Sequence, residues 1–235
     1  MPRRRRVCPG GWCYHAMNRS AGRVCIFDDA GDYAAFERVL AEAALRFAVR
    51  LCAYVLMPNH FHLVLWPRED DALSPFMQWL TMTHTQRWHA HRHSVGRGHL
   101  YQGRFKCFAT ELGEQFLGVC RYAERNPLRA NLVARAQDWR WCSLWRREFE
   151  GDRQPDGLVL SEWPVQRPAD WLAWVNAPET PAELEALRRS CRRGSPFGGE
   201  AWAKRTAEMM GIVSSLRPLG RPRKHREEAD REIGF

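Results

Sequence analysis

The pattern of apolar and polar residues in the first half of the chain predicts a helix followed by two neighbouring strands. Over residues 33–47 apolar side chains recur at every third or fourth position, as on one buried face of a helix. A later apolar stretch is interrupted by Pro58-Asn59, a turn signal, and then resumes. We therefore expect strands over residues 50–57 and 60–66, joined by a tight turn.

The same kind of pattern predicts the other elements of this half. Residues 12–17 have the pattern of a first strand, and a second helix is expected to open within residues 70–75 and to run to about His91. Residues 101–108 form a basic, aromatic segment that enters a fourth strand. A third helix is expected over residues 111–126 and should end before the proline that follows it. The predicted order is strand, helix, strand, strand, helix, strand, helix.

The second half of the chain gives weaker signals. Residues 1–150 hold the elements above and are expected to form one domain, followed by a proline-bearing connecting segment over 151–180. Two stretches of helical pattern, 181–193 and 199–210, predict a small helical extension that ends at residue 215. Residues 216–235 form a basic tail that we expect to be disordered. Non-specific phosphate attraction, or an arginine placed in a DNA minor groove, are the alternatives for this tail.

The second strand of the predicted hairpin begins with two histidines on one face. Side chains two positions apart on a strand point the same way, so His60 and His62 lie together while Phe61 and Leu63 point to the opposite face. Two such imidazoles can chelate one divalent metal ion. A histidine pair also occurs as a polar edge of a sheet, so a metal site needs further ligands.

The charge of the chain favours a nucleic-acid partner. The net charge of +9 and the pI of about 9.5 come almost wholly from arginine, because Lys106, Lys204 and Lys224 are the only lysines. Guanidinium groups bind phosphate oxygens through paired hydrogen bonds. A GC-rich genome would explain arginine in place of lysine, but it would not explain the excess of positive charge.

Membrane and zinc-binding classes are disfavoured. No apolar run reaches the roughly 20 residues that a membrane span needs, and the basic start of the chain lacks the apolar stretch of a secretory signal. We expect a cytoplasmic, nucleoid-associated protein with no membrane partner. The eight cysteines include no C-x-x-C pair, so reduced core thiols are expected rather than disulfides or a zinc site.

The third predicted helix presents a tyrosine and an asparagine four residues apart. Tyr122 and Asn126 therefore share a helix face. A tyrosine near a divalent ion can attack a phosphodiester, and a carboxamide oxygen can complete the shell of ligands around the ion. The alternative is that Tyr122 is a half-buried packing residue. Residues 101–108 suit single-stranded nucleic acid, with cations for phosphates and rings for bases, or form an ordinary edge strand.

Four motifs of the chain together resemble the REP-associated tyrosine transposases, relatives of the single-tyrosine HUH transposases of bacterial insertion sequences. The motifs are Tyr14–Arg19, Met57–His62, Gly98–Lys106 and Arg121–Ala130, and they occur in the order and at separations like those of that family. The resemblance covers about residues 3–147, and segments near residues 194–202 and 220–224 extend it.

The resemblance implies an α/β (α+β) fold: a ferredoxin-like antiparallel sheet with packed helices, the HUH endonuclease domain, which the predicted order of elements also fits. It implies that His60 and His62 hold Mg²⁺ or Mn²⁺ with Asn126 as a third ligand. It also implies that Tyr122 cuts single-stranded DNA and keeps the 5′-phosphate. The substrate class would be REP-like chromosomal repeats that fold as hairpins.

We therefore expect a transposase that nicks and rejoins single-stranded DNA hairpins as a monomer or homodimer. One alternative is a non-catalytic DNA-binding or repressor protein on the same fold. Another is a replication-initiator-type nickase, although the phosphate-binding loop of an accompanying helicase does not occur in the sequence. The residues expected to contact DNA are Arg97, Tyr101, Gln102, Arg104, Lys106, Arg121, Arg221, Arg223 and Lys224.

Overall fold

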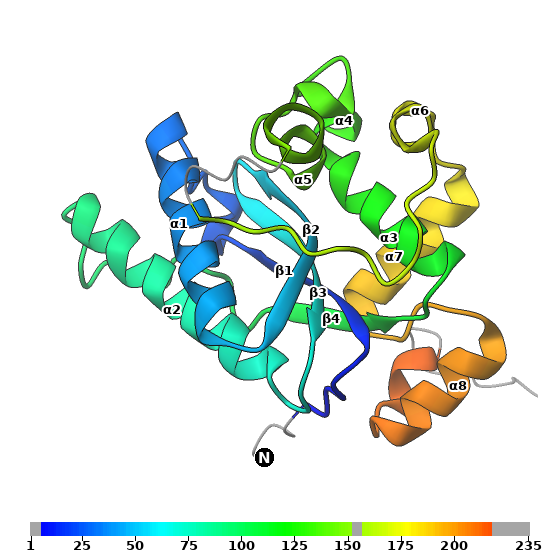
Figure 1. The fold of residues 1–235 in the computed structure, drawn as a ribbon. Coiled ribbons are helices and arrows are strands. Elements are labelled where there is room, and N and C mark those ends of the chain that lie inside the picture. The colour runs from blue at the N-terminus through cyan, green and yellow to red at the C-terminus, as the bar shows by residue number, and fades with distance from the viewer. Residues whose placement is uncertain (1–5, 152–156, 218–235) are drawn as a thin grey trace, which may run out of the picture.

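Four antiparallel strands form one sheet that carries helices on both faces (Figure 1). The computed structural model describes residues 6–151 and 157–217 of the 235-residue chain. The strands are β1 (Cys13–Arg19), β2 (Val49–Met57), β3 (His60–Pro67) and β4 (Lys106–Thr110). They lie in the order β2-β3-β1-β4, so β3 and β1 occupy the centre of the sheet.

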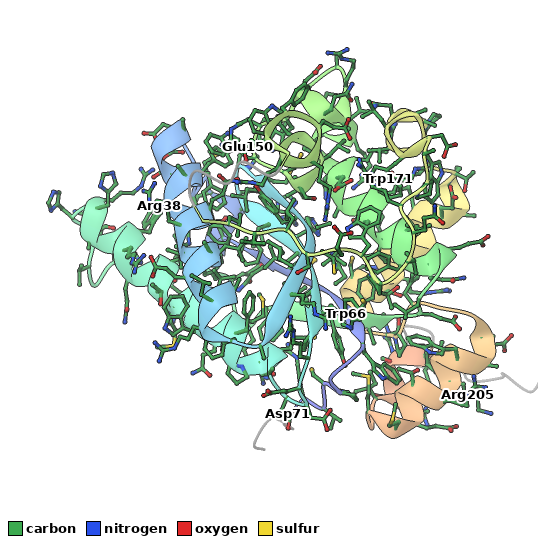
Figure 2. The ribbon with its side chains drawn as sticks, viewed as in Figure 1. Arg38, Trp66, Asp71, Glu150, Trp171 and Arg205 are labelled. Carbon is green, nitrogen blue, oxygen red and sulfur yellow. The ribbon has the colours of Figure 1, made fainter. Side chains whose placement is uncertain are left out.

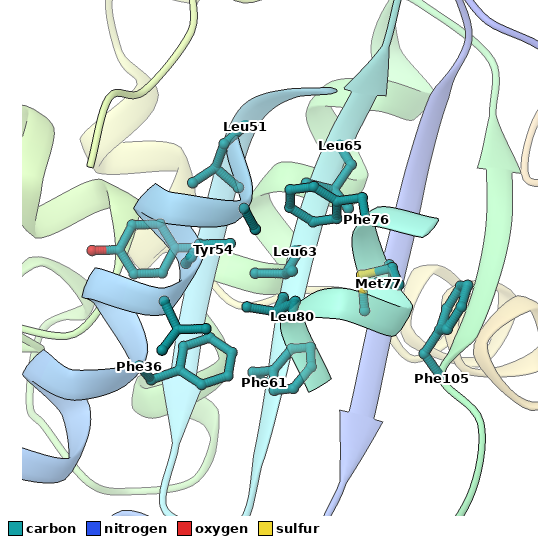
Figure 3. Packing of buried hydrophobic residues seen from close by; sticks show 14 of the residues in the cluster. Phe36, Leu51, Tyr54, Phe61, Leu63, Leu65, Phe76, Met77, Leu80 and Phe105 are labelled. Carbon is teal, nitrogen blue, oxygen red and sulfur yellow. The ribbon is translucent and has the colours of Figure 1, made fainter. Parts of the chain in front are cut away.

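Helices α1 (Ala30–Arg46) and α2 (Leu73–His91) cover one face of the sheet. The chain order β1-α1-β2-β3-α2-β4, with these strand neighbours, is the ferredoxin-like arrangement, so the expected α+β fold is confirmed. Phe36 of α1 and Leu80 of α2 belong to the apolar cluster that also holds Phe61 and Leu63 of β3 (Figure 3). Because side chains alternate along a strand, every second residue of β3 points to this face.

The opposite face is covered by α3 (Glu114–Glu124), α6 (Trp171–Asn176) and α7 (Pro181–Arg193). Their apolar side chains share one core with the sheet, a cluster that includes Val119 of α3, Leu187 of α7 and Val64 of β3. Trp171, labelled in Figure 2, donates from Nε1 to the carboxylate of Glu124 over 2.8 Å. Residues expected to form a connecting segment and an extension therefore complete this layer, and the proposed domain boundaries themselves stay a prediction.

The remaining helical segments are short. They are α4 (Asn126–Arg129), α5 (Ser143–Trp145), α8 (Glu200–Met209), single 3₁₀ turns at 21–23, 136–138 and 213–216, and a π-helical turn at 146–150. The helices expected over 181–193 and 199–210 are confirmed as α7 and α8. Across 6–151 and 157–217, no helix combines the length and the apolar character that crossing a membrane requires.

The third helix, α3, ends before Pro127 as expected, but it spans Glu114–Glu124 rather than residues 111–126. A separate short helix, α4, follows from Asn126 to Arg129, and Pro127 lies in its first turn. Proline is tolerated in a first turn because the N–H that it lacks would have no partner there. This short helix packs against β2, the strand that leads into the Pro58-Asn59 turn.

Candidate active site

Strand alternation places three histidines on the face of the sheet that α3 covers. His60 and His62 follow the Pro58-Asn59 turn on β3, and the antiparallel pairing sets Met17 of β1 opposite His62. His15, two residues earlier on β1, points to the same face, and its ring centroid lies 5.0 Å from that of His62. The centroids of His60 and His62 are 5.1 Å apart. His60 and His62 therefore lie side by side as predicted, and a third imidazole, that of His15, lies next to His62 on the neighbouring strand.

Tyr122 of α3 lies against these histidines. Its ring centroid is 5.8 Å from that of His62 and 6.2 Å from that of His15, in edge-on contacts. Val119 and Ala123 on the same helix are buried in the core against the sheet, which fixes the direction in which the tyrosine points. The side chain is 8% exposed. The helix that carries Tyr122 thus packs beside the strand that carries the histidine pair.

Hydrogen bonds hold both imidazoles of the pair by the same ring atom. His60 Nδ1 lies 2.7 Å from Oδ1 of Asn59, and His62 Nδ1 lies 2.9 Å from Nε2 of His15. In each ring the other nitrogen, Nε2, has no hydrogen-bond partner within the described chain. Metal-binding histidines are commonly held in this way, with one nitrogen fixed by the protein and the other left for the ion.

A buried ion pair fixes an arginine over the tyrosine ring. The guanidinium carbon of Arg129 lies 4.3 Å from the ring centroid of Tyr122, and its Nη2 donates to the Tyr122 carbonyl oxygen over 3.2 Å. Nη1 of the same side chain donates to Glu179 over 2.6 Å, and that carboxylate is almost wholly buried. Residue 179, between α6 and α7, thus holds a positive charge in place beside Tyr122.

The α7 helix adds a thiol to the same cluster. Cys191 Sγ lies 4.0 Å from Nδ1 of His15, on the side of that ring away from His62. Burial raises the pKa of Cys191 to about 11, against the opposing effects of the Tyr122 hydroxyl and Lys106. The thiol is therefore protonated at neutral pH and lies next to the tyrosine.

Burial sets the protonation of the site. It lowers the pKa of His60 to about 4, aided by Arg19 and Arg129, and it lowers the pKa of His62 well below the usual value. Both imidazoles are neutral at pH 7, which is the form that binds metal ions. Burial also raises the pKa of Tyr122, while Arg129 acts in the opposite direction. A cation close to the phenol is thus what favours its ionised, nucleophilic form.

The third expected ligand, Asn126, lies at the start of a short helix. Asn126 begins α4, four residues after Tyr122, and is 9% exposed. Its carboxamide has no hydrogen-bond partner among the described residues, so it remains available as an oxygen ligand. Within 6–151 and 157–217 no cluster of three or more His, Cys, Asp or Glu side chains is arranged to hold a metal ion. The ligand role of Asn126 stays a prediction.

The comparison with known families agrees with this geometry. Residues 11–126 match the family described as IS200-like transposases. This part of the chain belongs to the IS200-like transposase family. It is thus an enzyme of the transposase class, which acts on DNA. The match spans the three histidines and ends at Asn126, whereas Arg129, Glu179 and Cys191 lie beyond it.

A solved structure of a REP-associated tyrosine transposase bound to a REP hairpin is similar in fold to this transposase. The TM-score is 0.51 at 18% sequence identity, over 72% of this chain and 98% of that chain. At this identity the likeness establishes the architecture and leaves the substrate open. No curated protein matches the chain.

Three of the residues expected to bind DNA gather beside the histidine pair of the transposase. Gln102, Arg104 and Lys106 are exposed and line a cleft of about 280 Å³. The other wall of this cleft comes from Met17 and Arg19 of β1, the residues that pair with His62 and His60. The cleft therefore begins next to the candidate metal ligands.

The other expected DNA contacts lie elsewhere. Tyr101 is buried and its hydroxyl lies 2.6 Å from Nδ1 of His84, on the face covered by α1 and α2. Arg121 is also buried, and donates to the carbonyl oxygens of Trp174, Ala177 and Pro178. Both side chains are held by hydrogen bonds within the protein, and their contacts with DNA stay predictions. Arg97 is exposed on the loop between α2 and β4, and Arg221, Arg223 and Lys224 lie outside the described residues.

Sequence reasoning missed four members of the site: His15, Arg129, Glu179 and Cys191. His15 alternates with Met17 on β1, but which strand β1 pairs with is not visible in the sequence. Arg129 is three residues beyond Asn126, and residues three apart lie on the same side of a helix. This spacing is a signal that could have been used to find Arg129. Glu179 and Cys191 are brought in by tertiary packing alone.

Proposed function

We propose that this transposase is a metal-dependent endonuclease and strand transferase for single-stranded DNA. In this proposal it forms a 5′-phosphotyrosine intermediate at hairpin repeats of the REP type. The observation that carries the proposal is the position of Tyr122, beside the His60–His62 pair and under the guanidinium of Arg129. The hairpin substrate is supported by the REP hairpin bound to the solved structure of similar fold.

The histidine pair fits a divalent ion. Both rings are neutral, both are held through Nδ1, and both leave Nε2 free. Two imidazoles and the Asn126 oxygen make an incomplete shell, which suits Mg²⁺ or Mn²⁺ because these ions keep waters and bind substrate phosphates as well. When bound, such an ion would polarise the scissile phosphate.

The chain's own groups then account for the chemistry. The Tyr122 oxygen attacks phosphorus, the phenol loses its proton, and the bond from phosphorus to the 3′-oxygen breaks. That 3′-oxygen takes up a proton and leaves as a free hydroxyl, while the 5′-phosphate stays on the tyrosine. Arg129 stabilises the phenolate from above the ring. Attack by another 3′-hydroxyl on the phosphotyrosine reverses these steps and joins the strands.

Two connected clefts provide a path for the single strand. The cleft lined by Arg19, Arg104 and Lys106 shares residues 102–103 with a second cleft of about 510 Å³, which runs between residues 98–103 and α2. The first cleft is cationic and suits phosphates. The second has no arginine or lysine in its lining, which combines apolar side chains with hydroxyl and amide groups that suit base edges. A strand leaving the site would thus be held first by its backbone and then by its bases.

The decisive experiment is a search for a covalent adduct. Single-stranded REP-type hairpins are incubated with the protein and Mn²⁺, and an adduct that survives SDS and is removed by protease is measured. We expect wild type to form the adduct, EDTA to prevent it, and Tyr122→Phe to abolish it while hairpin binding persists. Tyr101→Phe removes a phenol that is held by His84 and should leave the adduct intact.

The outcome also separates the alternatives. An adduct that persists in Tyr122→Phe would reject Tyr122 as the nucleophile. Tight hairpin binding by wild type with no adduct under any metal condition would favour the non-catalytic DNA-binding protein instead. Cleavage of strands that carry no hairpin would favour the nickase of the replication-initiator type.

A further inference from the structure

The fully buried His15 occupies a position that neither the family match nor the proposed chemistry explains. It lies in the middle of β1, and its ring stacks on Phe108 of β4 with centroids 4.9 Å apart. One ring nitrogen, Nε2, lies 2.9 Å from Nδ1 of His62, and the other faces Cys191 Sγ at 4.0 Å. Burying an imidazole at this depth costs free energy unless its polar atoms are paired, so the contact with His62 has a structural purpose.

The contact constrains where the protons are. A neutral imidazole carries one N–H and one lone pair, and two rings buried together away from acidic groups are neutral. In one arrangement His62 donates from Nδ1 to His15, which leaves the lone pair of His62 Nε2 available. In the other, His15 donates from Nε2, and the only proton of His62 must then lie on its Nε2. The second arrangement blocks that nitrogen as a metal ligand.

The tautomer of His60, in contrast, is fixed by its neighbour. The amide of Asn59 is oriented because its Nδ2 donates to the carbonyl oxygen of Arg23 over 3.0 Å. Its Oδ1 therefore faces His60 Nδ1 and can only accept, which places the proton of His60 on Nδ1. One ligand of the pair is thus fixed by an amide, whereas the other depends on the tautomer of a second histidine.

We propose that His15 is a positioning residue for His62. Its Nε2 accepts a hydrogen bond from the Nδ1–H of His62, so that the Nε2 lone pair of His62 is presented to the metal ion. The single proton of His15 is then on its Nδ1, which faces Cys191. The inference rests on the metal role in the proposed function. It extends that role to a residue outside the ligand set and links the ligand to α7, because the thiol of Cys191 then serves as the weak acceptor at the end of the chain.

The first test measures Mn²⁺ affinity directly, by the electron paramagnetic resonance signal of free Mn²⁺. Residues that orient a metal ligand typically change affinity by about 10–100-fold when they are replaced. His15→Phe fills the space but cannot accept a hydrogen bond from His62, so we expect a loss of Mn²⁺ affinity of that size. His15→Gln can place an amide oxygen near the position of Nε2 and should retain most of the affinity.

A matched control separates positioning from a general effect on folding. His84→Phe removes another buried histidine, which contacts the Tyr101 hydroxyl on the opposite face of the sheet. It should lower the melting temperature as His15→Phe does, yet leave Mn²⁺ affinity unchanged. Equal Mn²⁺ affinity in His15→Phe and wild type would overturn the inference, as would equal losses in His15→Phe and His84→Phe.

The second test reads the tautomers by ¹⁵N NMR of the histidine rings in the Mg²⁺-loaded protein. We expect the proton on Nδ1 in both His15 and His62. A proton on Nε2 of His62 in the loaded protein would overturn the inference while leaving the metal site in place. Wild type that binds neither Mg²⁺ nor Mn²⁺, with or without a hairpin, would overturn the metal role itself and this inference with it.

Discussion

The guanidinium of Arg129 lies over the ring of Tyr122, with its carbon 4.3 Å from the ring centroid, and Glu179 holds it there. A fixed cation on the face of a phenol attracts the ring and stabilises the phenolate. Burial raises the pKa of Tyr122, and Glu179 adds to that rise, whereas Arg129 opposes it. The ion pair should therefore set the pH at which Tyr122, the proposed nucleophile, ionises.

Replacing Arg129 by glutamine should move the pH profile of DNA cleavage. Without the opposing cation the pKa of Tyr122 rises further, so the rising limb of the cleavage rate moves to higher pH. We expect a loss of about tenfold or more at neutral pH that shrinks as the pH increases. Glu179→Gln leaves the cation in place and should move the limb in the opposite direction. Single-turnover cleavage rates measured from pH 6 to 10 test both; coincident profiles for all three proteins would contradict the role of the ion pair.

Glu124→Gln should stabilise the protein at neutral and alkaline pH. This carboxylate is fully buried, and burial raises its pKa in spite of hydrogen bonds from Ser143 and Trp171. The folded state therefore binds the proton more tightly than the unfolded state, and stability present at low pH is lost as the pH rises through the folded pKa. Glutamine removes that loss. Urea unfolding at pH 5 and pH 8 should show an advantage for the variant that grows with pH, and an advantage largest at pH 5 would reject this account.

Arg121→Met should destabilise the fold without weakening hairpin binding. The buried guanidinium donates to three carbonyl oxygens, those of Trp174, Ala177 and Pro178, which anchor the end of α6 to α3. Leaving such acceptors unpaired costs about 1–3 kcal/mol or more in unfolding free energy. Denaturant titration measures the loss. Hairpin affinity, measured well below the melting temperature, should match wild type, because the side chain does not reach the clefts.

Replacing both Arg104 and Lys106 by alanine should weaken hairpin binding without destabilising the fold. Both side chains are exposed in the first cleft, so stability should change little while hairpin affinity falls. Each single-strand phosphate contact contributes about 0.7 to the slope of log affinity against log salt, so the slope should flatten by about 1.4. The control is Arg87→Ala, which removes an exposed cation of α2 that is paired with Glu42 of α1. An unchanged slope in the double variant would place the strand elsewhere.

Much of the site follows from the sequence because its parts are local. The Pro58-Asn59 turn and the period of two along β3 are enough to place His60 and His62 on one face. The spacing of four predicts Tyr122 and Asn126 on one helix, whereas the structure places them on the successive helices α3 and α4. The contact of His15 with His62 depends on the pairing of β1 with β3, which no local pattern reveals. Arg121 shows a different limit. An arginine in a basic chain is expected at the surface, whereas this one is buried because backbone carbonyls of α6 happen to converge on it.

The cluster around Tyr122 joins residues from nearly the whole length of the chain, and this has a consequence for its synthesis. His15 and Cys191 meet across 176 positions, and Glu179 reaches Arg129 from 50 positions away. A ribosome that has made residues 1–130 has already produced every residue proposed for the chemistry, but neither the carboxylate that holds Arg129 nor the helix that covers His15. The proposed cleavage activity should therefore be absent from the nascent protein until α7 emerges, and a product of translation that is truncated before α7 should lack it as well.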